Sequence, residues 1–71
     1  MNLNDAELGK EYLIKSVDTC GDEEMESFLF TLGCYSGEPI TVVSRKKKNL
    51  TVSIKDARYS IDCELAAAIM I

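Results

Sequence analysis

The feature that most constrains the fold is one short amphipathic helix that stops at a glycine. Its apolar residues recur at i, i+3, i+4 and i+7 and so share one face over about three turns: Met25, Phe28, Leu29 and Leu32. Acidic residues 22–24 precede this stripe, where negative charge stabilises a helix N-terminus. Gly33 follows it, where a left-handed C-terminal cap is expected. A chain of 71 residues built around such a helix has room for one small domain with one core.

The segment before the helix, residues 11–19, is predicted to be a strand with a defect. Tyr12 and Ile14 keep a period of two residues, and Val17 then falls out of phase by one. Such a slip indicates a bulge or a sharp bend, which small barrels use to curve a strand.

Three strands in a meander are predicted after the helix, at residues 40–45, 50–55 and 58–62. The middle one alternates apolar and polar residues without a break, so we expect one buried face and one solvent face. A short turn at Asp56-Ala57 separates it from the next strand. In the first of the three, Val43 is out of phase with Ile40 and Val42. That pattern predicts a strand covered on both sides.

A helical turn at residues 63–67 and a last short strand at residues 68–71 complete the chain. The order is strand, helix, three strands, helical turn, strand. About five short strands around one helix indicate a mainly β fold, because closure into a small barrel hides the edges of such strands. Residues 1–71 are predicted to form this single domain, without repeats or linkers.

The composition argues against catalysis. The chain has no histidine, which is the usual acid–base side chain near neutral pH. Cys34 has no neighbouring base or cation in sequence that would lower its pKa and activate it as a nucleophile. Together with Cys20 and Cys63 it makes an odd number of thiols without a C-x-x-C pair, and no signal peptide or membrane-length apolar run is evident. We therefore expect free thiols in the cytoplasm.

Two charged clusters offer weaker functional hypotheses. The carboxylates at residues 22–26 suit hard cations, but iron or zinc sites normally add imidazole or paired thiolate, so neither a metal site nor a cofactor is predicted. Residues 45–48 (Arg-Lys-Lys-Lys) form a basic tip that could face nucleic acid, anionic lipid or an acidic partner. With a net charge of −4 and no interleaved aromatic residues, the tip is interpreted as a solvated turn, and no nucleic-acid partner is predicted.

The corner after the helix is the best candidate for a partner-binding site. Binding residues concentrate in loops held between rigid elements, and this loop contains Gly33, Cys34, Tyr35, Ser36 and Gly37. Tyr35 is the preferred anchor because its ring is amphipathic. Phe30 lies roughly opposite the apolar stripe. It is interpreted as a second anchor, as a scattered surface apolar residue, or as a residue in contact with an N-terminal arm around Leu3 and Leu8.

Several short motifs, taken in their order and spacing, resemble the FeoA family. They are Leu8-Gly9, Ile14, Leu32-Gly33, Gly37 before Ile40-Thr41-Val42-Val43, Tyr59-Ser60-Ile61, Leu65-Ala66 and Ile69-Met70-Ile71. The resemblance extends from Leu3 to Ile71. Ser36 departs from it by standing where the family usually has proline, and the helix is acidic where the family often has a basic residue.

The resemblance implies an SH3-like β-barrel without enzymatic activity of its own. It implies a small cytosolic accessory or regulatory protein of bacterial ferrous iron uptake. The implied partner is a FeoB-type membrane transporter with a GTPase domain, through which alone the chain would reach the membrane. Weak self-association is a further expectation. An iron-sensing module and a nucleic-acid-binding SH3-like module remain as alternatives.

Overall fold

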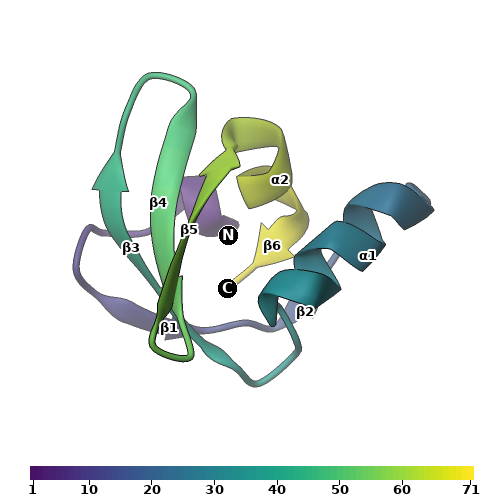
Figure 1. Cartoon of the computed structure of the whole chain (residues 1–71), viewed down its shortest axis with the longest axis horizontal. Helices are drawn as coiled ribbons and strands as arrows, with labels where there is room; N and C mark the ends of the chain where they lie inside the picture. Colours follow the sequence, from purple (N-terminus) through teal and green to yellow (C-terminus); the bar gives the residue numbers. More distant parts are fainter.

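A computed structural model describes all residues from Met1 to Ile71 (Figure 1). The elements in chain order are η1 (Leu3–Asp5), β1 (Glu11–Leu13), β2 (Ser16–Val17), α1 (Glu23–Leu32), β3 (Pro39–Arg45), β4 (Asn49–Ile54), β5 (Ala57–Asp62), α2 (Cys63–Ala68) and β6 (Ile69–Met70). The fold is mainly β, as predicted, with six strands instead of about five. Neither α-helix has the length and apolarity needed to cross a membrane.

The strands form two antiparallel sheets. The larger sheet has the order β1-β3-β4-β5, and β2 pairs with β6 in the smaller one. Figure 1 shows the larger sheet on one side of the molecule, α2 and β6 beside it, and α1 at the opposite side. The core lies between these layers. Its largest fully buried side chains come from η1, the bend after β1, α1, β3, β4 and β6: Leu3, Ile14, Leu29, Ile40, Val42, Leu50, Val52, Ile54 and Ile69.

The predicted alternation in β4 is confirmed. Leu50, Val52 and Ile54 are all buried, whereas Thr51 and Ser53 between them are half-buried on the other face. Each apolar residue of the strand therefore contributes to one core. This strand lies between β3 and β5 and pairs with both, which makes it the centre of the sheet.

The predicted strand at residues 11–19 is divided into two. β1 pairs with β3, and β2 pairs with β6, so the two halves belong to different sheets. The chain bends between them, where the Ile14 amide donates to the Glu38 carbonyl at 2.9 Å and the Lys15 amide donates to the Met70 carbonyl at 2.7 Å. The defect signalled at Val17 is thus a sharp bend, and it lies slightly earlier in the chain.

Val43 marks a β-bulge and not a strand covered on both sides. The register between β3 and β4 shifts between Val42 and Ser44, and Val43 is half-buried. One extra residue in β3 reverses the side-chain phase after that point, which explains the out-of-phase valine.

The predicted turn after β4 is also wrong by one residue. Lys55 and Asp56 occupy it with φ of 49° and 66°, the geometry of a type I′ hairpin turn.

Helix α1 has the predicted limits but is less buried than its stripe indicates. The Asp22 carboxylate accepts from the Met25 amide at 3.1 Å, and Gly33 closes the helix with a φ of 96°. Of the stripe, only Leu29 is fully buried, and Phe28 is 46% exposed. The N-terminal arm also differs from its prediction. Leu3 is buried, as expected of an anchor, whereas Leu8 is exposed.

Helix α2 extends the predicted helical turn by one residue, to Ala68. It is capped by Asp62, whose carboxylate accepts from the Leu65 amide at 2.8 Å. The last strand, β6, is correspondingly shorter than predicted.

Candidate functional site

The corner after α1 is held in place by its own backbone. The Cys34 amide donates to the Leu29 carbonyl at 3.0 Å, and the Gly33 amide donates to the Phe30 carbonyl at 3.0 Å, which satisfies carbonyls at the helix end. Gly33 is favoured here by its backbone, whose φ is 96°. A Cβ at this position would lie 3.4 Å from Cγ2 of Ile54, which is van der Waals contact. Gly33 therefore places the corner directly on the end of β4.

The second half of the corner is a β-turn fixed to the bend between β1 and β2. The Glu38 amide donates to the Tyr35 carbonyl at 3.0 Å, and Gly37, with a φ of 89°, supplies the positive φ that a type II turn needs at its third residue. The Gly37 amide donates to the Ile14 carbonyl at 2.7 Å, and the Ser36 hydroxyl donates to the Lys15 carbonyl at 3.0 Å. Few main-chain motions are left to this loop.

Two exposed aromatic rings meet on this rigid corner. Phe30 and Tyr35 stack with ring centroids 5.4 Å apart and an interplanar angle of 14°, an arrangement that aromatic pairs favour. Phe30 is 36% exposed and Tyr35 is 46% exposed. We call this pair the aromatic platform. The ring of Phe30 thus lies against Tyr35, and the alternative of a contact with the N-terminal arm is not needed to explain it.

A cation and a carboxylate flank the platform. The Lys55 Nζ atom lies 5.4 Å from the centroid of the Tyr35 ring, within range of a cation–π interaction. The same atom is 3.8 Å from Oε1 of Glu38. Sequence reasoning did not find Lys55, which comes from the β4–β5 turn, and no local signal connects that turn with the corner.

Cys34 does not present its side chain to a partner. It is 1% exposed and belongs to the core, and burial raises the pKa of its thiol from 9.0 to about 11. The thiol therefore stays neutral near neutral pH and is a poor nucleophile. The prediction that Cys34 is a binding residue therefore does not hold for its side chain. The neighbouring residues Tyr35, Ser36 and Gly37 are exposed.

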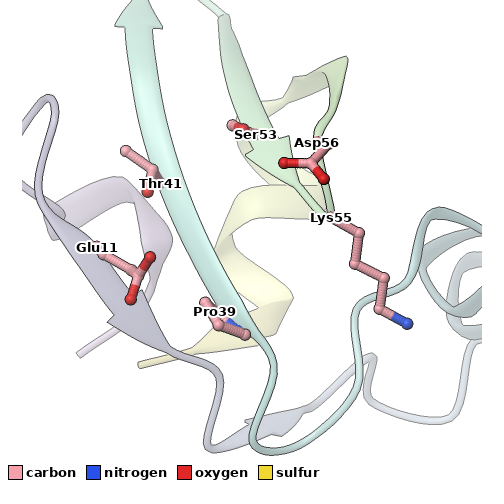
Figure 2. Close-up of a pocket in the computed structure, with 6 residues that line it drawn as sticks. All are labelled: Glu11, Pro39, Thr41, Ser53, Lys55 and Asp56. Carbon is pink, nitrogen blue, oxygen red and sulfur yellow. The ribbon is translucent and has the colours of Figure 1, made fainter.

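A shallow polar depression lies beside the platform (Figure 2). It is lined by Glu11, Pro39, Thr41, Ser53, Lys55 and Asp56. Thr41 and Ser53 are opposite each other in the β3–β4 register and alternate with the buried Val42 and Val52, so the depression is on the face of the sheet away from the core. In Figure 2 the Lys55 side chain extends away from the other lining side chains. Lys55 therefore connects this polar face with Tyr35.

In the acidic and basic clusters noted in the sequence, some side chains have structural roles, as Asp22 does in capping α1. Among His, Cys, Asp and Glu side chains, no group of three or more is arranged to hold a metal ion. Within the basic tip, the Arg45 guanidinium donates to the Asn4 carbonyl at 3.2 Å and to the Ala6 carbonyl at 2.8 Å. Arg45 thus fastens the N-terminal arm to β3, and three exposed lysines at residues 46–48 remain.

Three solved structures share this fold. Stenotrophomonas maltophilia FeoA complexed with zinc, described as a procaryotic SH3 domain protein, has a TM-score of 0.88 and 22% identity, over 99% of this chain and 87% of its own. An iron uptake regulatory protein (FeoA) has a TM-score of 0.85 and 18% identity, over 97% and 91%. A manganese-dependent transcriptional repressor has a TM-score of 0.87 and 18% identity, over 97% of this chain and 39% of its own.

These likenesses establish the SH3-like fold. No curated protein matches the chain significantly in sequence. The model of the FeoA domain, in contrast, matches all of residues 1–71. With the full domain matched and the fold shared, the chain belongs to the FeoA family, which is involved in ferrous iron transport.

Proposed function

We propose that the chain is a small cytoplasmic accessory protein of ferrous iron uptake that acts by binding the cytosolic side of a FeoB-type membrane transporter. The observation that carries this proposal is the aromatic platform. Phe30, in the last turn of α1, and Tyr35, in the corner loop, expose stacked rings, and the loop is fixed by hydrogen bonds to the bend between β1 and β2. Aromatic anchors supply much of the binding energy of protein interfaces, and a preformed anchor loses little entropy on binding.

Binding agrees better than catalysis with the side chains present. The chain has no histidine, and the Cys34 thiol is buried with a raised pKa. The polar depression in Figure 2 is lined by no hydrophobic side chain, and the Lys55 Nζ atom pairs with Glu38 outside it. No hydrogen bond joins a hydroxyl of the depression to one of its carboxylates, so the nucleophile–base pair typical of an enzymatic site is not formed there.

The two alternative functions have less support in the geometry. An iron sensor needs several ligands on one ion, and the acidic residues at the start of α1 include Asp22, which is engaged as a helix cap. A nucleic-acid-binding barrel would use the basic tip, where Arg45 is already engaged by two carbonyls. Binding of the three remaining lysines to phosphates would depend strongly on salt.

Co-purification with a tagged FeoB-type transporter tests the proposal. Tyr35→Ala should weaken binding by about tenfold or more and Phe30→Ala by somewhat less, since central aromatic anchors typically cost that much when truncated. Both residues are exposed, so the variants should remain folded by circular dichroism. Leu8→Ala is the matched control: Leu8 is 54% exposed, and the loop between η1 and β1 lies across the molecule from α1 (Figure 1).

Two results would contradict the proposal at different levels. Unchanged binding by a folded Tyr35→Ala variant would remove the aromatic platform from the interface. Absence of any binding by the wild-type chain, in detergent and with nucleotide present, would refute the transporter as the partner.

A further inference from the structure

A second apolar surface of α1 faces α2 and is surrounded by carboxylates. Its floor is formed by Met25 and Phe28 of α1 and by Leu65 of α2. Phe28 is 46% exposed, and Met25 and Leu65 are half-buried. We call this surface the interhelix groove. A large apolar side chain in a concave surface is the usual element of a docking site, whereas scattered exposed apolar residues need no explanation.

The rim of the interhelix groove carries four acidic side chains, a cap and a first-turn residue at the start of each helix: Asp22, Glu24, Asp62 and Glu64. The two aspartates each use one oxygen to cap a helix. The two glutamates accept no hydrogen bond and form no ion pair, since the one salt bridge of the protein joins Lys55 to Glu38. Capping explains the two aspartates, and Glu24 and Glu64 lie in the first turns of their helices, where negative charge complements the helix dipole. Because neither glutamate is held by a hydrogen bond or an ion pair, both carboxylates can also face a partner.

We infer that the interhelix groove binds a cationic amphipathic segment of a partner protein. This inference rests on the proposed function, because it describes the chemistry of the segment with which such a partner would dock. Apolar side chains of such a segment would cover Met25, Phe28 and Leu65, and its lysines or arginines would face the four carboxylates. Helix-in-groove recognition uses this combination of apolar anchors and charged edges, and complementary charge sets orientation and speeds association. The net charge of −4 favours approach of a cation and opposes approach of an acidic segment.

A second copy of this chain is a poorer occupant. Its cationic element would be the basic tip, residues 45–48, which lies near α2, because the Cys63 amide donates to the Lys48 carbonyl at 2.9 Å. The tip offers lysines but no free apolar side chain, since the next apolar residue, Leu50, is 1% exposed. The lysines of the tip could therefore face the carboxylates of the rim, but the tip could not cover the apolar floor of the groove.

The test uses three synthetic peptides of equal length with the intact chain: a helical leucine–lysine peptide, its leucine–glutamate counterpart, and a serine–lysine peptide of the same charge. Calorimetry at low and moderate salt measures affinity. Only the leucine–lysine peptide should bind well. Phe28→Ala should weaken it by about tenfold. Glu24→Gln with Glu64→Gln should weaken it by about three- to tenfold and reduce its salt dependence.

The matched control is Glu7→Gln with Glu11→Gln, which removes the same charge from exposed residues outside the groove. This variant should bind the leucine–lysine peptide nearly as wild type does. Equal losses in the two double variants would overturn the inference, because attraction to the overall charge would then explain binding. Equal affinity for the serine–lysine peptide would also overturn it, as would a dimer in sedimentation that the groove variant abolishes.

Transporter binding by the same variants separates this inference from the proposed function. If wild type binds the transporter and the peptides do not bind the groove, the inference fails and the proposed function stands. If wild type does not bind the transporter, the proposed function fails whatever the peptides do. Weaker transporter binding by Phe28→Ala, alongside specific peptide binding, would support both.

Discussion

The four-stranded sheet and helix α1 use apolar side chains in opposite ways. In β4, every apolar residue from Leu50 to Ile54 is buried. In α1, the apolar stripe has one fully buried member, Leu29, and the helix exposes Phe28 on the groove side and Phe30 at the aromatic platform. The centre of the sheet thus adds its apolar side chains to the core, while α1 and its corner leave aromatic rings exposed, which we propose bind a partner.

This difference matters in a domain of 71 residues. Such a small fold has little stability to lose, and Phe28 and Phe30, left partly in solvent, add little to it. The corner nevertheless keeps its position, because Gly33, Ser36 and Gly37 fix it to β4 and to the bend after β1. A firmly held loop with a sparsely buried helix is a suitable arrangement for a binding surface.

Core truncation in the sheet should give the largest effect. Ile40→Ala removes a fully buried side chain, and it should lower the free energy of unfolding by about 2–5 kcal/mol. In urea denaturation the variant should be largely unfolded or close to it. Phe28→Ala likewise replaces a large side chain with a small one, but in α1, and it should lower the free energy of unfolding by less than about 0.5 kcal/mol. Similar losses in both variants would contradict the division between sheet and helix.

Alkaline pH should destabilise the fold through Cys34. Burial raises the pKa of its thiol from 9.0 to about 11, so between these values the unfolded chain releases a proton that the folded chain retains. Stability should therefore be unaffected by this group below pH 9 and should fall as pH rises from 9 to 11. Chemical denaturation across that range measures it. Cys34→Ala is the control, and an identical pH profile for that variant would rule out the thiol as the cause.

Native-state hydrogen exchange should distinguish the two regions without any mutation. Amides of β4 should exchange only on global unfolding, whereas amides in the middle of α1 should exchange at least about tenfold faster through local opening. That factor corresponds to about 1.4 kcal/mol. Equal protection in β4 and α1 would show that the helix is as firmly attached as the sheet.

The smallest effect concerns the β4–β5 turn, where Asp56 has a φ of 66°. Asp56→Gly should raise the free energy of unfolding by about 0.5–1 kcal/mol, because glycine adopts this conformation without strain and suits a type I′ turn. Ala57→Gly, one residue later in β5, should destabilise instead. Thermal denaturation of both variants checks the sign, and destabilisation by Asp56→Gly would contradict the role given to backbone strain.

The sequence predicted the parts of this fold that depend on local periodicity. The limits of α1, the alternation in β4 and the helical turn at α2 all follow from residues close together in the chain. The predictions failed where distant contacts decide. Whether Phe28 is buried depends on how α1 meets α2, and the meaning of Val43 depends on the register between β3 and β4.

The binding surface was predictable to a smaller extent. The sequence indicated Tyr35 as an anchor, with Phe30 one turn earlier, and the structure stacks the two rings. It gave no sign of Lys55 over the Tyr35 ring, nor of the interhelix groove, whose lining residues come from two helices separated by three strands. Cys34, adjacent to Tyr35, lies in the core, whereas residues 35–37 after it are exposed.

We propose that α1 and its corner carry the partner interface. Backbone amide shifts of the labelled chain test this directly when the cytosolic GTPase-bearing domain of a FeoB-type transporter is added. Shifts should concentrate in residues 22–38 and in the groove residues 62–65, and they should leave the rest of β5 and the basic tip nearly unchanged. Shifts centred on residues 45–49, or on the polar depression around Thr41 and Ser53, would contradict this proposal.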